Sequence, residues 1–236
     1  MRKINLILDF DGVINNEPFA TINAFKNVFR KIKCRHSPEE AFLFLKHLDE
    51  NYGRFKYSTL IKRTFKEFTK INPDLCLNLF NESFKIKPQQ RIISILDKYN
   101  DILNTIIFSR NNIKTIKRFI DNFSLSVYFN KIYASQKKYK LITFKNLCKS
   151  EKLKRANTLF VGDDIYDVYF PKLMNYKFLL LNPLFDKSPE EKLLEKLAGE
   201  GFEPPTSGSL SSPLHYLSGR RIFQTNVAEH VSAKSE

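Results

Sequence analysis

The sequence predicts an α/β fold, in which a parallel sheet with helices on both faces is interrupted early by an all-helical segment. Two observations lead to this prediction. Beyond residue 100, short apolar runs that are typical of buried strands alternate with stretches of helical spacing. Between about residues 18 and 100 the spacing of apolar residues is helical throughout, and the strand-like run before it covers residues 4–8.

The first expected strand ends directly before Asp9. Its residues, 4–8, are short and apolar, as expected for a strand that is buried on both faces of a parallel sheet. The remaining strands are expected at residues 105–108, 131–134, 158–161 and 178–181, with helices through 92–96, 113–120, 141–153 and 165–174.

The all-helical segment has its own start and stop signals. Ser37, followed by Pro38 and by Glu40, has the form of a capping box and predicts a helix start. Asn72 before a proline predicts another start, and Gly53 is a predicted stop.

Composition indicates a globular protein with one core, or one core and a small accessory domain. The chain has 236 residues, of which 42% are hydrophobic and 27% charged. No apolar run approaches the ~20 residues of a membrane span, and the apolar N-terminal run is too short for a signal sequence. Three widely separated cysteines suit a reducing compartment and argue against a zinc site, so we expect a cytoplasmic protein without membrane contact.

The formal net charge of +14 is large enough to attract anionic partners. The basic residues are spread along the chain, however, and a composition rich in Lys, Asn, Ile and Phe also follows from AT-rich coding. Nucleic-acid binding is therefore possible but not favoured.

Residues 196–236 differ from the rest of the chain. From residue 199 on they hold four of the seven glycines and one lysine, and they show no sustained periodicity. The stretch 198–208 resembles a transfer-RNA gene translated as protein. We expect this tail to be disordered or not to belong to the natural protein, and we assign it no function.

Two acids follow the first predicted strand, in the sequence Asp9-Phe-Asp11-Gly12. Ligands of open parallel sheets bind beyond the carboxyl ends of the strands, and two close carboxylates attract a hard cation such as Mg²⁺. One carboxylate can attack phosphorus, and the other can protonate the leaving oxygen. A calcium loop is the alternative, but it needs its glycine at the sixth position, whereas Gly12 is fourth.

Two further segments supply candidate phosphate ligands. Ser109 at the end of a predicted strand can donate its hydroxyl to phosphate, with Arg110 beside it, although a serine there can also cap the next helix. Lys137, Lys138 and Lys140 offer the fixed cation that phosphoryl transfer requires, although each alone is also typical of surface charge.

A last acidic motif follows the strand at 158–161, in the sequence Gly162-Asp163-Asp164-Ile-Tyr-Asp167. Asp163 and Asp167 lie one helical turn apart and can face the same ion. Acids at a helix N-terminus also occur without any ion, because they complement the helix dipole.

These four motifs, in this order over about residues 4–185, resemble those of the haloacid dehalogenase superfamily. The resemblance implies a Rossmann-like three-layer parallel sheet core, formed by residues 1–15 and 88–195. It also implies an inserted all-helical cap, formed by residues 16–87.

The resemblance further implies a role for each motif residue. Asp9 would be the nucleophile and Asp11 the acid and base, while Ser109 and a lysine would bind phosphate. Asp9, the backbone carbonyl of Asp11 and Asp163 would hold Mg²⁺, with Asp167 supporting or ligating; whether Asp164 replaces Asp163 stays open. The lysine of the family usually precedes a proline, and no Lys-Pro pair occurs here. Lys138 is preferred because Leu141 and Ile142 follow it at a family-like offset, and Lys140 is second.

The predicted function is a magnesium-dependent phosphate monoester hydrolase that acts on a small phosphorylated metabolite through a phosphoaspartyl intermediate. Members of the superfamily that cleave carbon–halogen bonds lack an acid at the position of Asp11, so its presence favours phosphate esters. The alternatives are a phosphosugar mutase of the same superfamily and a non-catalytic basic module that binds nucleic acid. The sequence leaves the substrate and the oligomeric state open.

Overall fold

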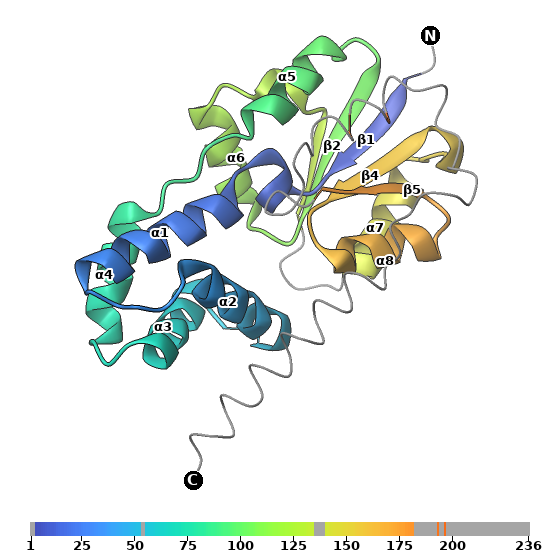
Figure 1. The fold of residues 1–236 in the computed structure, drawn as a ribbon. Helices are drawn as coiled ribbons and strands as arrows, with labels where there is room; N and C mark the ends of the chain where they lie inside the picture. The colour runs from blue at the N-terminus through green and yellow to red at the C-terminus, as the bar shows by residue number, and fades with distance from the viewer. Residues whose placement is uncertain (1–2, 53–54, 135–139, 182–192, 194–195, 197–236) are drawn as a thin grey trace. The chain divides into compact units, whose positions relative to one another are not determined.

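A five-stranded parallel sheet forms the centre of the structure, a computed structural model that describes residues 3–52, 55–134, 140–181, 193 and 196 (Figure 1). The strand order is β3-β2-β1-β4-β5. The strands are β1 (Ile4–Leu8), β2 (Leu103–Ser109), β3 (Lys131–Ala134), β4 (Thr158–Gly162) and β5 (Lys177–Leu180). The prediction of an α/β fold with a parallel sheet is confirmed, and all five expected strands are present.

Strand β1 lies in the middle of the sheet, between β2 and β4. Its last residue, Leu8, pairs in parallel register with Ile107 on one side and with Val161 on the other. The chain runs from β1 outward to β2 and β3 and then returns to the other side of β1. The segments that follow β1 and β4 therefore lie side by side at the switch point of the sheet, where open α/β folds bind their ligands.

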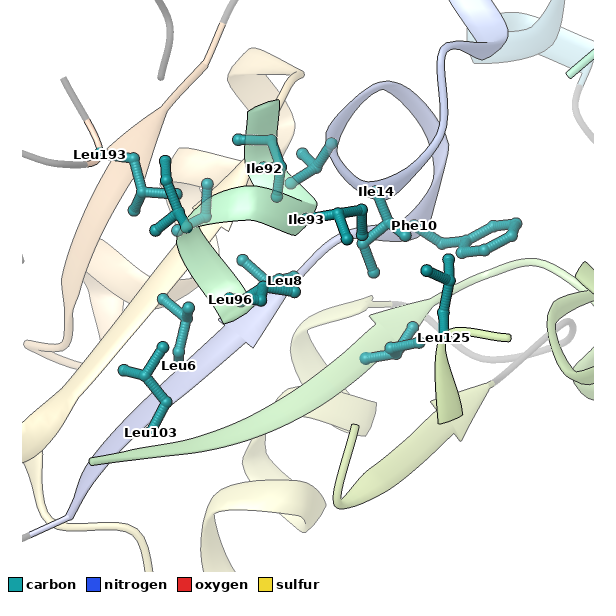
Figure 2. Close-up of a cluster of buried hydrophobic side chains, with 14 of the residues drawn as sticks. Leu6, Leu8, Phe10, Ile14, Ile92, Ile93, Leu96, Leu103, Leu125 and Leu193 are labelled. Atoms are coloured by element: carbon teal, nitrogen blue, oxygen red, sulfur yellow. The ribbon is translucent and has the colours of Figure 1, made fainter. Parts of the chain in front are cut away.

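Helices cover both faces of the sheet. On one face, Leu6 and Leu8 pack with α5 (Gln90–Lys98) and α6 (Ile113–Asn122), and Figure 2 shows part of this cluster. On the other face, Ile7 packs with α7 (Lys140–Ser150) and α8 (Ile165–Leu173). Alternate residues of β1 thus point into two different cores, which explains why this strand reads as a continuous apolar run. Short helical turns are formed by Ser126–Tyr128 (η2) and by Arg155–Asn157 (η3).

Four helices between β1 and β2 share a hydrophobic core of their own. They are α1 (Glu17–Lys31), α2 (Pro38–Tyr52), α3 (Tyr57–Phe68) and α4 (Pro73–Ser83). Phe25 lies at the centre of this core, with its ring 5.3 Å from that of Phe65 and 5.1 Å from that of Phe80. Edge-to-face packing of this kind stabilises the cluster beyond its buried area alone.

Both predicted helix starts in this segment are confirmed. Ser37 Oγ accepts hydrogen bonds from the backbone N–H groups of Glu39 and Glu40, and the Glu40 carboxylate accepts one from the N–H of Ser37, as a capping box requires. The side chain of Asn72 accepts a hydrogen bond from the N–H of Asp74. The predicted stop at Gly53 lies outside the described residues.

The two ends of this helical segment meet. The N–H of Asn16 donates to the carbonyl of Lys87 at 2.9 Å, and the N–H of Lys87 donates to the Asn16 side chain at 2.6 Å. Asn15 and Pro88 form an isolated antiparallel bridge next to them. The chain thus leaves the sheet and returns to it through one narrow connection.

Among the described residues, no helix is long and apolar enough to cross a membrane. Cys34, Cys76 and Cys148 are free thiols. The tail expected from residue 196 onward lies outside the described residues, apart from Lys196 itself.

Candidate active site

Three neighbouring strands deliver the candidate site residues to one edge of the sheet. Asp9 follows β1 directly, Ser109 is the last residue of β2, and Asp163 follows β4. The N–H of Asp9 still donates to the carbonyl of Val161 on β4 at 2.8 Å, so the segments after β1 and β4 begin side by side.

A single turn over Phe10–Ile14 (η1) redirects the chain after Asp9. Gly12 has a φ of +77°, in the left-handed region that side chains with a Cβ rarely adopt. A Cβ on Gly12 would also lie 2.2 Å from Oδ2 of Asp163. Glycine is therefore required here for two reasons. It tolerates the positive φ of the turn, and its lack of a Cβ leaves room for the side chain of Asp163.

Asp9, Asp163 and Asp167 form a carboxylate triad, in which one oxygen of each residue lies within 4.8 Å of the others. Asp9 and Asp167 are buried. Burial raises the pKa of Asp163 and that of Asp167 to about 7 each, and neighbouring acids add to the effect in both cases. Oδ2 of Asp167 is buried and has no hydrogen-bond partner among the described residues. Three clustered carboxylates share a single close ammonium, that of Lys140, among the described residues, and such a donor set fits a hard divalent cation.

Gly162 makes room for this triad, since a Cβ at that position would lie 2.5 Å from Cβ of Asp167. Of the two adjacent acids after Gly162, Asp163 joins the triad. Asp164 instead accepts a hydrogen bond at 3.4 Å from Lys46 of α2.

Lys140, the first residue of α7, reaches into the triad. Its Nζ donates to Oδ2 of Asp9 at 2.7 Å and to Oδ1 of Asp167 at 2.5 Å. Burial alone would lower the pKa of Lys140, but the two carboxylates outweigh it and raise the pKa above its ordinary value. Lys138, which the sequence favoured, and Lys137 lie outside the described residues.

Asp11 has a different environment from that of the triad. Its Oδ1 accepts a hydrogen bond from Nδ2 of Asn15 at 2.9 Å, and its Oδ2 accepts one from Nδ2 of Asn111 at 3.2 Å. Burial and, second, the charge of Glu17 raise the pKa of Asp11 to about 6, although both amide bonds oppose the shift. A carboxyl group that titrates near neutrality can both give and take a proton.

Ser109 is 3% exposed, and its Oγ accepts a hydrogen bond from the N–H of Asn111 at 3.0 Å. It does not cap the following helix, because Asn112 is the N-cap of α6 and accepts from the N–H of Lys114. Arg110 faces α2: its Nη2 lies 4.0 Å from Oδ2 of Asp49, and its side chain is 63% exposed.

The structure adds three residues that the sequence reasoning did not single out. Asn15 and Asn111 hold Asp11, and Lys46 brings α2 to the second acidic motif. Only Asn111 carried a signal, since it lies two residues beyond Ser109 at the end of a strand. The other two contacts depend on how the turn after β1 and the inserted helices pack.

A family model described as haloacid dehalogenase-like hydrolase matches residues 6–181. Among solved structures, the chain is similar to the proposed hydrolase YfnB from Bacillus subtilis, bound to magnesium (14% identity, TM-score 0.62, covering 84% of this chain and 99% of that one). It is also similar to L-2-haloacid dehalogenase from Xanthobacter autotrophicus, with 13% identity and a TM-score of 0.58, over 86% of this chain and 85% of that one. A third similar structure is a proposed phosphatase from Clostridium difficile, with 16% identity and a TM-score of 0.51, over 76% of this chain and 85% of that one. A search of curated sequences finds no match.

Proposed function

The chain belongs to the haloacid dehalogenase-like hydrolase family, and on that premise we propose that it is a magnesium-dependent phosphate monoester hydrolase. Solved structures of similar fold include both a haloacid dehalogenase and a proposed phosphatase, so the fold alone does not choose between the two reactions. The observation that carries the proposal is the partly buried carboxyl group of Asp11, which two side-chain amides hold beside the triad. Cleavage of a carbon–halogen bond needs no such acid, because halide leaves without a proton.

The triad supports the proposed metal site. Asp9, Asp163 and Asp167, with the backbone carbonyl of Asp11, would hold Mg²⁺. The clustered oxygens are suitable donors, among them Oδ2 of Asp167, which has no hydrogen-bond partner in the described part of the chain. Bound there, the ion would offset the negative charge of the attacking carboxylate and of the phosphate oxygens. A magnesium-bound structure of the same fold, YfnB, is consistent with this assignment.

The first half of the proposed reaction transfers the phosphoryl group to the protein. A carboxylate oxygen of Asp9 attacks phosphorus, and the bond from phosphorus to the leaving oxygen breaks. Asp11 gives its proton to that oxygen, which departs as an alcohol. The N–H of Phe10 and the ammonium of Lys140 donate to different oxygens of Asp9 and so fix the orientation of its carboxylate.

The second half releases phosphate. Asp11, now a carboxylate, takes a proton from water, and the water oxygen attacks phosphorus. The bond between Asp9 and phosphorus breaks, which restores the carboxylate and yields inorganic phosphate. We assign the phosphate oxygens to the hydroxyl of Ser109 and to Lys140, because charge on these oxygens needs fixed donors. Arg110 and Lys138 remain predicted phosphate ligands.

We also propose that residues 16–87 act as a cap on a core formed by residues 1–15 and 88–195. The single narrow connection between Asn16 and Lys87 supports this division. Helix α2 supplies two contacts to the core, from Lys46 to Asp164 and from Asp49 to Arg110. Both contacts adjoin the motifs of the site, so side chains of α2 are suitable for selecting a small phosphorylated metabolite.

The proposed function is tested by measuring phosphate release from a panel of phosphorylated metabolites and from 4-nitrophenyl phosphate. We expect activity with Mg²⁺ and none after chelation with EDTA. A matched assay follows chloride release from 2-chloropropionate. Halide release in the absence of any phosphatase activity would contradict the proposal, as would phosphate release that is unaffected by EDTA.

A further inference from the structure

The Asp11 carboxylate is held from two sides by side-chain amides. Asn15 donates to Oδ1 at 2.9 Å and Asn111 donates to Oδ2 at 3.2 Å. Each carboxylate oxygen has two lone pairs, so each keeps one for a second partner. The amides therefore fix the plane of the carboxyl group without using up its capacity to exchange a proton.

The orientation of both amides follows from their other hydrogen bonds. Oδ1 of Asn15 accepts from the N–H of Gly12 at 3.3 Å and from the N–H of Glu17 at 2.9 Å. Oδ1 of Asn111 accepts from the N–H of Asn112 at 2.7 Å. Because each amide oxygen is engaged by a backbone donor, each NH₂ group must be the one that faces Asp11.

The two amides differ in where they come from. Asn15 is completely buried and belongs to the turn that carries Asp11. Asn111 comes from the segment after β2, and its N–H donates to Oγ of Ser109 at 3.0 Å. Asn111 thus joins the proposed acid to the proposed phosphate-binding hydroxyl. Of the two oxygens of Asp11, Oδ2 is the one that Asn111 contacts.

We propose that Asn111 is a positioning residue that aims Oδ2 of Asp11 at the leaving oxygen of the substrate, while Asn15 anchors the other oxygen. The inference rests on the proposed function. As the bond between phosphorus and the leaving oxygen breaks, the proton on Oδ2 moves to that oxygen. In the second half, Oδ2 takes a proton from water. Without Asn111 the carboxyl group is held at one oxygen only and can rotate away from both partners.

Two esters with different leaving groups test this role. Glycerol 2-phosphate has a poor leaving group that must be protonated, whereas 4-nitrophenolate departs readily without a proton. In Asn111→Ala, we expect kcat/KM for glycerol 2-phosphate to fall roughly 10²-fold, which is the lower end of the loss expected when a general acid is removed. The value for 4-nitrophenyl phosphate should fall at least about tenfold less, because that reaction depends little on the proton. Asn111→Asp keeps the shape but replaces the donor by a carboxylate, and should show the same selective loss.

The neighbouring Asn112 provides the matched control. Its side chain caps α6 by accepting from the N–H of Lys114 at 2.8 Å. Asn112→Ala should lower Tm slightly and leave the ratio of the two kcat/KM values unchanged. Equal losses on both esters in the Asn111 variants, or no loss, would overturn the positioning role. A wild-type protein that releases phosphate neither from these two esters nor from any member of the metabolite panel overturns the proposed function instead.

Discussion

Asp9 and Asp11 are two residues apart at the end of the same strand, yet their side chains contact groups of different charge. Asp9 lies among charges: two other carboxylates and the ammonium of Lys140. Asp11 accepts hydrogen bonds from two neutral amides, and burial, followed by the charge of Glu17, raises its pKa to about 6. The ammonium of Lys140 and the N–H of Phe10 orient the carboxylate of Asp9 for attack, whereas the desolvated setting of Asp11 lets that side chain carry a proton near neutral pH. The difference shows how one short motif can supply both chemical roles.

Among the residues that contact Asp9, the largest effect of a substitution is expected at Lys140. Lys140→Met removes the cation that contacts Asp9 and Asp167, and we expect kcat to fall roughly 10²–10³-fold, as for the loss of a fixed electrostatic donor. Steady-state kinetics at saturating Mg²⁺ provide the measurement. Lys131→Met is the control, because Lys131 pairs with Glu151 at 2.6 Å on the surface, and kcat should stay at the wild-type value. A Lys140 variant with wild-type kcat would contradict the role of the cation.

A smaller effect, on stabilisation by Mg²⁺, should distinguish Asp163 from Asp164. Mg²⁺ at a hundred times its dissociation constant should stabilise the native protein by about 2.7 kcal/mol, which appears as a rise in Tm. Asp163→Asn should abolish this rise, because Asp163 belongs to the triad. Asp164→Asn should retain it, since Asp164 pairs with Lys46 instead. The reverse pattern, measured by thermal unfolding with and without Mg²⁺, would place the ion on the other acid.

Much of the fold could be predicted from local sequence patterns. The predicted strand at 131–134 matches β3 residue for residue, and that at 178–181 differs from β5 by one position. Burial on both faces explains the apolar runs of the inner strands β2 and β4, whereas β3 and β5 lie at the edges of the sheet and are only partly buried. The helix starts at Ser37 and Asn72 could be predicted because a cap depends on residues within one turn.

The details of the site depended on contacts that the sequence does not encode locally. Asn111 and Asp11 are 100 positions apart, and no spacing rule joins an amide to a carboxyl group over that distance. The choice between Asp163 and Asp164 depends on the backbone path where β4 ends, which places one of the two side chains beside Gly12. The choice among the lysines depends on where α7 begins, and the structure begins that helix at Lys140.

The central claim, that Asp9 becomes phosphorylated during turnover, can be tested by chemical trapping. The protein is mixed with a substrate from the panel and Mg²⁺, quenched in acid, reduced with borohydride and analysed by peptide mass spectrometry. Borohydride converts an aspartyl phosphate to homoserine, so we expect homoserine at position 9 in the wild-type protein. We expect none in Asp9→Asn, which should also lose at least about 10⁴-fold in kcat. Rapid phosphate release with residue 9 unmodified, or with the label on another carboxylate, would contradict the account.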